Sequence, residues 1–262
     1  MKRIVFALGL LAAPSMNLAV PDAGEIIKQS VTANQRNLAV ASDFDHSERV
    51  LSRDGTRTYS VTMLLGSPYE RLTAINDEML SDDDKRRELQ KLDAARMERE
   101  HETPEERTHR LEGHEKERRR NRRLLDELPQ AFDFAVEGEQ TVGKFDAYVL
   151  RATPRHDYQP PILEAEVLKG MEGRFWIDRQ SFQWIKVEVA VTRPVTIQGF
   201  LAKLEPGTQF ALEQQPVATD VWQPTHLSMR TRGRILFVFK QRTQIDTTFF
   251  DYQRVERPAQ SH

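Results

Sequence analysis

Apolar and polar residues alternate along most of this sequence, and this period of two limits the possible folds more than any other feature. The segment 182–193 shows the pattern clearly, because every second residue in its middle is apolar: Ile185, Val187, Val189 and Val191. Successive side chains of a β-strand point to opposite faces of a sheet. The alternation therefore predicts strands that bury one face and expose the other.

The alternation covers enough of the chain to predict a large sheet. Strands are expected at 38–50, 59–65, 69–75, 131–136, 148–152, 174–178, 182–193, 208–215, 222–232 and 235–252. Gly55 lies between the first two, which are expected to form a hairpin. Because the connections are short and contain almost no helix, apart from a segment at 162–171, the sheet is expected to be antiparallel.

One helix is expected before the first strand. Asp22 can accept hydrogen bonds from the first turn of a helix that runs to about Asn37. Apolar residues recur on one side of this segment: Ile26, Ile27, Val31 and Ala33. This stripe predicts a helix that packs on the sheet.

A highly charged segment, 77–128, interrupts the alternation. Ser81 to Asp84 and Thr103 to Glu106 both have the spacing of a capping box. Two helices are therefore expected, at 82–100 and 104–127, with Pro129 closing the segment. Their apolar residues are few, so these helices are expected to lie on a surface, project as an arm or contact a partner.

The N-terminus has the pattern of a secretory signal. Lys2 and Arg3 precede an apolar run from Ile4 to Ala13, which is shorter than the roughly 20 residues that span a bilayer. We expect a signal peptide at 1–19, a single domain at 20–257 and a disordered tail at 258–262. An exported, soluble, non-spanning product follows from this interpretation.

Composition narrows the possible partners. The 262 residues include no cysteine, which excludes disulfides, thiolate metal sites and lipid attachment to a cysteine. The formal net charge is -2, which gives no overall attraction to nucleic acid. The basic run Lys116 to Arg123 could bind nucleic acid or an acidic headgroup, but the glutamates beside it favour a solvated helix face.

No catalytic or cofactor motif is visible. The sequence has no G-x-S-x-G, no phosphate-binding glycine loop and no dinucleotide fingerprint. His101 and His114 each precede a glutamate, but neither has a second histidine at the spacing of a zinc protease. We therefore expect no cofactor, no metal and no enzymatic activity.

Aromatic and aliphatic residues on alternating strand positions give the expected sheet one apolar face. That face could be an ordinary core or a concave surface that holds an apolar ligand. Under the second interpretation, the ligand-binding residues are Val61, Met63, Phe132, Phe134, Tyr148, Leu150, Phe210 and Leu212. Each lies on the apolar side of an expected strand.

Two blocks resemble LolA-like envelope proteins, a family of lipoprotein carriers, receptors and related sensor domains. They are AFDFAVEGEQTVGKFDAYVLRATP (131–154) and GRFWIDRQSFQWIKVEV (173–189). The resemblance implies a mostly β, α+β fold: a half-open, curled antiparallel sheet or half-barrel with helices as a lid. It also implies a periplasmic, non-catalytic carrier whose interior holds the acyl chains of lipids or lipoproteins.

A second function remains open. The charged helical pair at 77–128 is longer than a lid requires, so the chain could instead be an envelope interaction or sensor module. In that case the helices contact a partner protein. A hollow apolar face would favour the carrier, and a packed core would favour the interaction module.

Overall fold

The computed structural model describes residues 22–197, 202–235 and 239–255. The expected signal peptide at 1–19 and tail at 258–262 lie outside these ranges, as does Phe237 of the last expected strand. Each remains a prediction.

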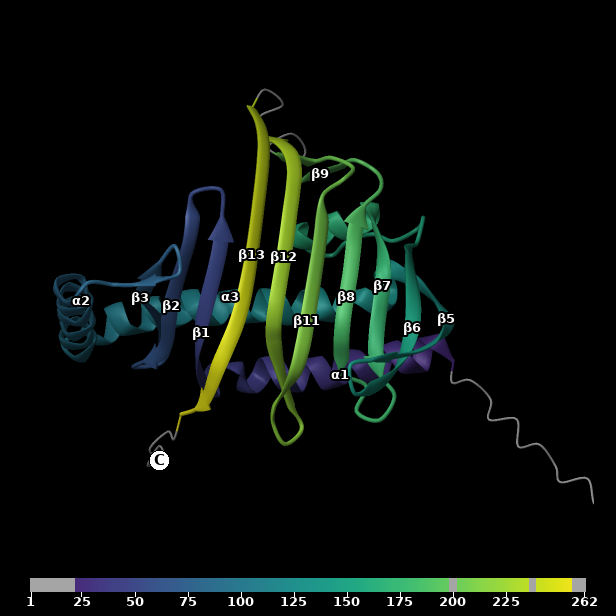
Figure 1. Cartoon of the computed structure of the whole chain (residues 1–262). Helices are drawn as coiled ribbons and strands as arrows, with labels where there is room; N and C mark the ends of the chain where they lie inside the picture. Colours follow the sequence, from purple (N-terminus) through teal and green to yellow (C-terminus); the bar gives the residue numbers. More distant parts are fainter. Residues whose placement is uncertain (1–21, 198–201, 236–238, 256–262) are drawn as a thin grey trace, which may run out of the picture.

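The described residues form one large antiparallel sheet (Figure 1). Its strands are β1 (Phe44–Ser52), β2 (Gly55–Leu64), β3 (Ser67–Ile75), β4 (Glu78–Met79), β5 (Phe132–Val142), β6 (Phe145–Pro154), β7 (Met171–Asp178), β8 (Trp184–Val191), β9 (Val195–Ile197), β10 (Ala202–Leu204), β11 (Gln209–Ala218), β12 (Val221–Ile235) and β13 (Phe239–Arg254). The main order is β4-β3-β2-β1-β13-β12-β11-β8-β7-β6-β5, and β9 and β10 extend from β12. Since β4 and β5 are end strands that do not pair, the sheet is curled but not closed, which confirms the predicted fold class.

Helices cover one face of the sheet. They are α1 (Ala23–Val40), α2 (Asp82–Glu100) and α3 (Pro104–Ala131), with two 3-10 helices, η1 (Ala41–Asp43) and η2 (Leu163–Gly170). Figure 1 shows α1 and α3 crossing behind the strands, whereas α2 lies beside β3 at one edge. None of the helices in the described ranges is both long and apolar enough to cross a membrane.

The first helix is longer than predicted. Asp22 caps it by accepting a hydrogen bond from the Glu25 amide, as expected. The predicted strand start at Leu38 is wrong, because α1 continues to Val40 and β1 begins only at Phe44. Contacts from elsewhere in the chain hold this end: Arg118 donates hydrogen bonds to the carbonyls of Leu38 and Ala39. These bonds satisfy carbonyls that a helix end leaves free.

The charged helical pair forms where it was predicted. Ser81 caps α2, and Thr103 forms a complete capping box with Glu106 at the start of α3. Pro129 does not close the segment as predicted, because α3 continues through it to Ala131. Burial of Leu128 and Ala131 against the sheet offsets the hydrogen bond that the proline removes.

The last hairpin also differs from the prediction. The alternation predicts that the final strand begins at Ile235. In the structure Ile235 is instead the last residue of β12, and its backbone pairs with Phe239 of β13. The short strands β4, β9 and β10 were not predicted. Each has only two or three residues, which is too short for a period of two to be recognised.

Candidate binding faces of the sheet

Strand register divides the side chains of the sheet between two faces. Leu150 pairs with Phe175, Phe175 with Val187 and Val187 with Leu212, so these residues share one face. This face packs against α1 and α3, and we call it the inner face. Their neighbours along each strand, such as Arg151, Arg174 and Glu188, lie on the opposite, outer face.

One half of the inner face is filled. On β5 to β8, which we call the covered half, the side chains of Leu150 and Ile177 are fully buried and that of Phe175 nearly so. Residues from α1, the last turns of α3 and η2 complete the same cluster: Ile26, Ile27, Val31, Leu128, Ala131, Ala165 and Leu168. This half is an ordinary packed core.

Hydrogen bonds at the rim of the covered half join the helices to the strands. The Tyr158 hydroxyl donates a hydrogen bond to Glu127 Oε2 at 2.7 Å, and burial raises the pKa of Tyr158. At the end of α1, Asn37 donates to Gln183 at 2.7 Å and accepts from the Trp222 amide at 3.1 Å. These bonds attach the helix to the strand ends over which it crosses.

The other half of the inner face is only partly covered. It comprises the inner side of β11, β12, β13, β1 and β2, and we call it the open half. Many of its apolar side chains remain partly accessible, and Met229 is 37% exposed. Register makes five of them neighbours across β11, β12 and β13: Phe210, Leu212, Leu227, Met229 and Ile245. Val50, Phe249 and Tyr59 lie further along the same face, with Thr247 and Glu48 between them.

The sequence of α3 explains why this half stays open. Between Leu111 and Leu124 the helix carries no apolar side chain, and its partly buried residues there are His114, Glu115, Arg118 and Arg122. Such side chains cannot fill an apolar interface without a desolvation cost. Burial lowers the pKa of His114, because desolvation disfavours the charged imidazole.

An aromatic cluster borders the open half on β1 and β13. The rings of His46 and Tyr252 stack at 5.1 Å between centroids, and Phe249 lies 6.0 Å from His46. The Tyr252 hydroxyl donates to the Pro224 carbonyl at 2.7 Å, and burial raises the pKa of Tyr252. Val61 pairs with His46 across the strands and is itself buried.

The eight predicted ligand-binding residues are thus divided between different surroundings. Phe132, Tyr148 and Leu150 are buried in the core of the covered half, and Phe134 and Leu212 pack against that core with part of their surface accessible. The remaining three lie outside this cluster: Phe210 is partly exposed, Met63 is partly buried, and Val61 is buried beside His46. Their role in ligand binding remains a prediction.

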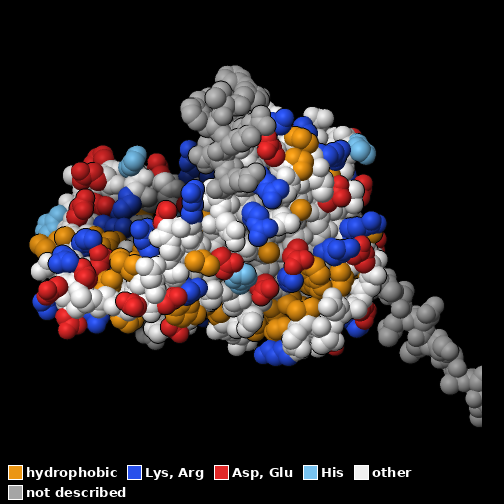
Figure 2. Space-filling model, turned by 45° about the horizontal axis from the view of Figure 1, so that its top comes forward, with side chains coloured by type: hydrophobic (Ala, Val, Ile, Leu, Met, Phe, Trp, Pro, Cys, Tyr) orange, Lys and Arg blue, Asp and Glu red, His pale blue; other side chains and the backbone are white. Residues whose placement is uncertain are grey.

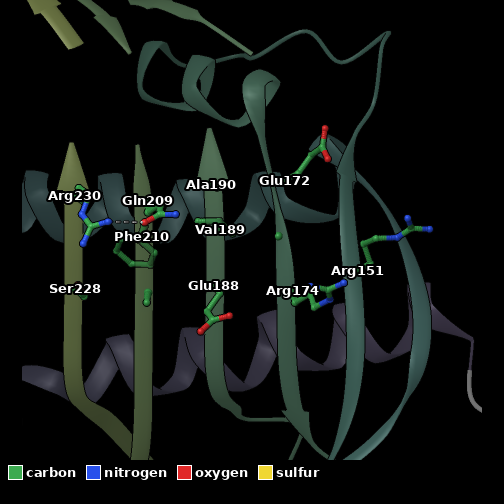
Figure 3. A pocket seen from close by; sticks show the side chains of 12 residues that line it. Arg151, Glu172, Arg174, Glu188, Val189, Ala190, Gln209, Phe210, Ser228 and Arg230 are labelled. Carbon is green, nitrogen blue, oxygen red and sulfur yellow. Dashed lines mark hydrogen bonds between the residues drawn. The ribbon is translucent and has the colours of Figure 1, made fainter. Parts of the chain in front are cut away.

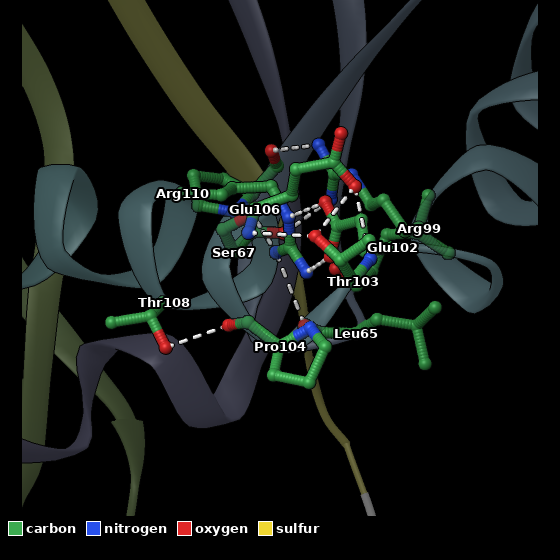
Figure 4. Close-up of polar contacts among 11 residues, drawn as sticks. Leu65, Ser67, Arg99, Glu102, Thr103, Pro104, Glu106, Thr108 and Arg110 are labelled. Carbon is green, nitrogen blue, oxygen red and sulfur yellow. Dashed lines mark hydrogen bonds and ion pairs between the residues drawn. The ribbon is translucent and has the colours of Figure 1, made fainter.

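The junction of α2 and α3 is fixed to the β2–β3 turn by polar contacts (Figure 4). Arg99 donates to the carbonyls of Leu64 and Ser67 at 2.7 and 3.0 Å. Arg110 forms a bidentate ion pair with Glu102, with both hydrogen bonds at 2.6 Å. This ion pair lowers the pKa of the Glu102 carboxyl group. The helical pair is therefore attached to the sheet at this corner, although α2 has no buried residue.

The outer face has a polar trough of about 510 Å³ (Figure 3). Its floor consists of small residues on adjacent strands: Ala190, Ala211 and Ser228. The charged groups around it are largely paired, since Arg174 and Arg151 both contact Glu137, at 2.6 and 3.5 Å. Within the described ranges, no three His, Asp or Glu side chains are placed to hold a metal ion.

Comparison with known proteins gives matches only among solved structures. No protein-family model matches the chain, and no curated protein matches it. Similar structures include a DUF1329 family protein from Desulfovibrio piger, at 10% identity and a TM-score of 0.34, with 88% of this chain and 92% of that chain covered. A LolA superfamily protein from Nitrosomonas europaea has 10% identity and a TM-score of 0.32, with 91% and 96% covered.

A third similar structure is an outer membrane lipoprotein-sorting protein domain from Vibrio parahaemolyticus, at 11% identity and a TM-score of 0.29, with 87% and 93% covered. The chain is similar to LolA-like proteins. The family that its sequence resembles is thus found again among its structural neighbours.

Sequence reasoning missed most of the open half. On β11 to β13 it selected Phe210 and Leu212, but not Leu227, Met229 or Ile245, which register places beside them. On β2 it selected Val61 and Met63. The alternation in β12 and β13 carried the necessary signal. Threonines and charged residues between the apolar ones weaken this alternation. Only the pairing of the strands shows that the apolar residues lie next to one another.

Proposed function

We propose that this protein is a non-catalytic carrier of lipid or lipoprotein acyl chains in the bacterial periplasm. The bound acyl chain lies along the open half of the inner face. The observation that carries the proposal is the strip of partly exposed apolar residues beneath a helix segment with no apolar side chain. A monomeric soluble protein rarely leaves such a contiguous apolar surface without a binding role. The signal-like N-terminus supports the location.

The available energy suits reversible binding. Each buried methylene contributes about 0.8 kcal/mol, so about ten methylenes contribute about 8 kcal/mol before the entropic costs of binding. A net free energy of about 8 kcal/mol corresponds to a dissociation constant of about 1 μM. A longer acyl chain could therefore be held and released without any catalytic group.

A pair of adjacent residues gives the test. Leu227 lies on the inner face, and Ser228 follows it on the outer face in the polar trough. Leu227→Arg should keep the fold and abolish binding of a fluorescent fatty acid to lipid-stripped protein. Ser228→Arg should leave binding unchanged. A wild-type protein that is well folded and binds no such probe would contradict the proposal.

A specific observation also favours the interaction module. On α2, Leu89 and Met97 are 48% and 60% exposed, and nearby Met79 is 69% exposed. Such residues suit contact with another envelope protein. Replacing all three by serine should then remove a protein partner from crosslinked envelope fractions and leave fatty-acid binding intact. Loss of fatty-acid binding instead would connect α2 to the carrier function.

A further inference from the structure

The sequence suggests one place for binding acidic groups, but the structure shows that the cations there are largely neutralised. In the run Lys116 to Arg123, Arg122 contacts Glu115 at 2.5 Å and Arg120 contacts Glu117 at 3.5 Å. Arg118 also satisfies the end of α1. The most basic stretch of the sequence is therefore mainly a helix surface with internal ion pairs.

Cations without such partners gather elsewhere, near the β12–β13 hairpin. Within the described part of the chain, Arg53, Arg230 and Arg232 form no ion pair with a carboxylate, and the side-chain contact of Arg230 is a 3.4 Å bond to Gln209. All three are exposed. Figure 2 shows Lys and Arg side chains near the middle of this side of the molecule.

The three arginines line one groove of about 600 Å³, together with Leu51, Thr243 and Gln244. The groove lies at a step in the sheet, because β1 pairs with β13 only as far as Leu51 and Asp246. Asp246, the acid of this groove, is held by His226 at 3.0 Å. Leu51 is 43% exposed and adds an apolar patch beside the cations.

The three guanidinium groups of this groove favour a partner that carries phosphates. A guanidinium binds phosphate oxygens through two parallel hydrogen bonds.

We propose that the groove formed by Arg53, Arg230 and Arg232 is a docking surface for the phosphate headgroups of an anionic lipid bilayer. Figure 1 shows β12 and β13 projecting beyond β1 and β11. Three cations spread along one groove suit an array of phosphates better than a single small ion. The proposal extends the carrier function, since a carrier must meet a membrane, but it depends on different residues.

Vesicle flotation tests the proposal with protein purified from the envelope fraction of expressing cells. Wild-type protein should float with vesicles of phosphatidylcholine mixed with phosphatidylglycerol, should not float with pure phosphatidylcholine, and should be released by high salt. The triple variant Arg53→Gln, Arg230→Gln, Arg232→Gln should bind on the order of a hundredfold more weakly, at about fivefold for each charge.

Two matched triple variants complete the experiment. Arg36→Gln, Arg86→Gln, Arg107→Gln removes three exposed charges elsewhere and should leave flotation unchanged. A second control tests the basic run of α3 with the triple variant Lys116→Gln, Arg119→Gln, Arg123→Gln. It should also leave flotation unchanged. Equal loss in all variants, loss only in the α3 variant, or no flotation of the wild type would overturn the proposal.

Cations at an exposed strand edge can also prevent aggregation. If preventing aggregation were the only role of these arginines, the wild type would not float with the vesicles. The groove variant would then aggregate, as measured by light scattering. Fatty-acid binding should be normal in the groove variant. Loss of flotation with normal probe binding therefore separates this docking surface from the proposed ligand site.

Discussion

The covered and open halves of the inner face are built from similar strands, yet different helix segments cover them. The last turns of α3 bring Leu124, Leu125 and Leu128 to the covered half, where the strand side chains are sealed. Along the open half, the same helix presents polar residues such as His114 and Arg118. One continuous sheet can therefore supply both a packed core and a ligand surface, depending on which helix residues lie opposite it.

The largest expected contrast comes from placing a charge in each half. Leu150→Arg should unfold the protein, because the side chain at this position is fully buried and an unpaired guanidinium there would be very costly. Leu212→Arg should fold, since its side chain can reach solvent from the open half. Circular dichroism during heating measures the unfolding transition of both variants. Cooperative melting of Leu150→Arg near the wild-type temperature would show that the covered half is not sealed.

Truncation should give a smaller contrast in the same direction. Ile177→Ala should lower the free energy of unfolding by about 2–5 kcal/mol, the usual cost of a cavity in a close-packed core. Ile245→Ala should cost about 1 kcal/mol or less, because that side chain is already partly exposed. Urea unfolding gives both values. Equal losses would mean that both halves are packed alike.

A third contrast concerns the two charged helices. Leu128→Ala on α3 should destabilise by about 2 kcal/mol or more, because Leu128 is part of the core. Leu89→Ala on α2 should change stability by less than about 0.5 kcal/mol, because that residue is 48% exposed. Thermal unfolding of the two variants compares them. A large effect at Leu89 would mean that α2 is packed in a way that the exposed surface does not show.

The smallest effect should come from pH. Burial lowers the folded-state pKa of His114, so the unfolded chain binds the proton more readily. Stability should therefore fall as the pH decreases below the unfolded histidine value of about 6.5. His114→Gln should flatten this part of the stability curve, measured by urea unfolding at several pH values. An unchanged slope in the variant would assign the titration to other groups.

The sequence was a good guide to local structure. Alternation predicted β8 because Val187 and Val189 recur on the same side of a strand, and the capping box predicted the start of α3 at Pro104. It failed where distant contacts decide the outcome. Leu38 stays helical because Arg118 binds its carbonyl, and α3 continues past Pro129 because Leu128 is buried.

The candidate sites were harder to predict for the same reason. Period two placed Leu150 and Leu212 on one face, which is correct, but could not show that a helix seals only the first. The basic run of α3 is conspicuous because its cations are consecutive. Arg53 and Arg230 line the same groove only because strands that are distant in the sequence lie side by side, so no local sequence pattern predicts this site.

A spin-labelled fatty acid provides the most direct test of the central claim that an apolar ligand lies on the open half. Nuclear magnetic resonance of methyl-labelled protein should show broadening of Leu212, Leu227, Met229 and Ile245 when the ligand is added. The methyl groups of Leu150 and Ile177 in the covered half should be affected far less, as should Ala211 in the outer trough. Broadening centred on Ala211, or none at any of these positions, would contradict the account.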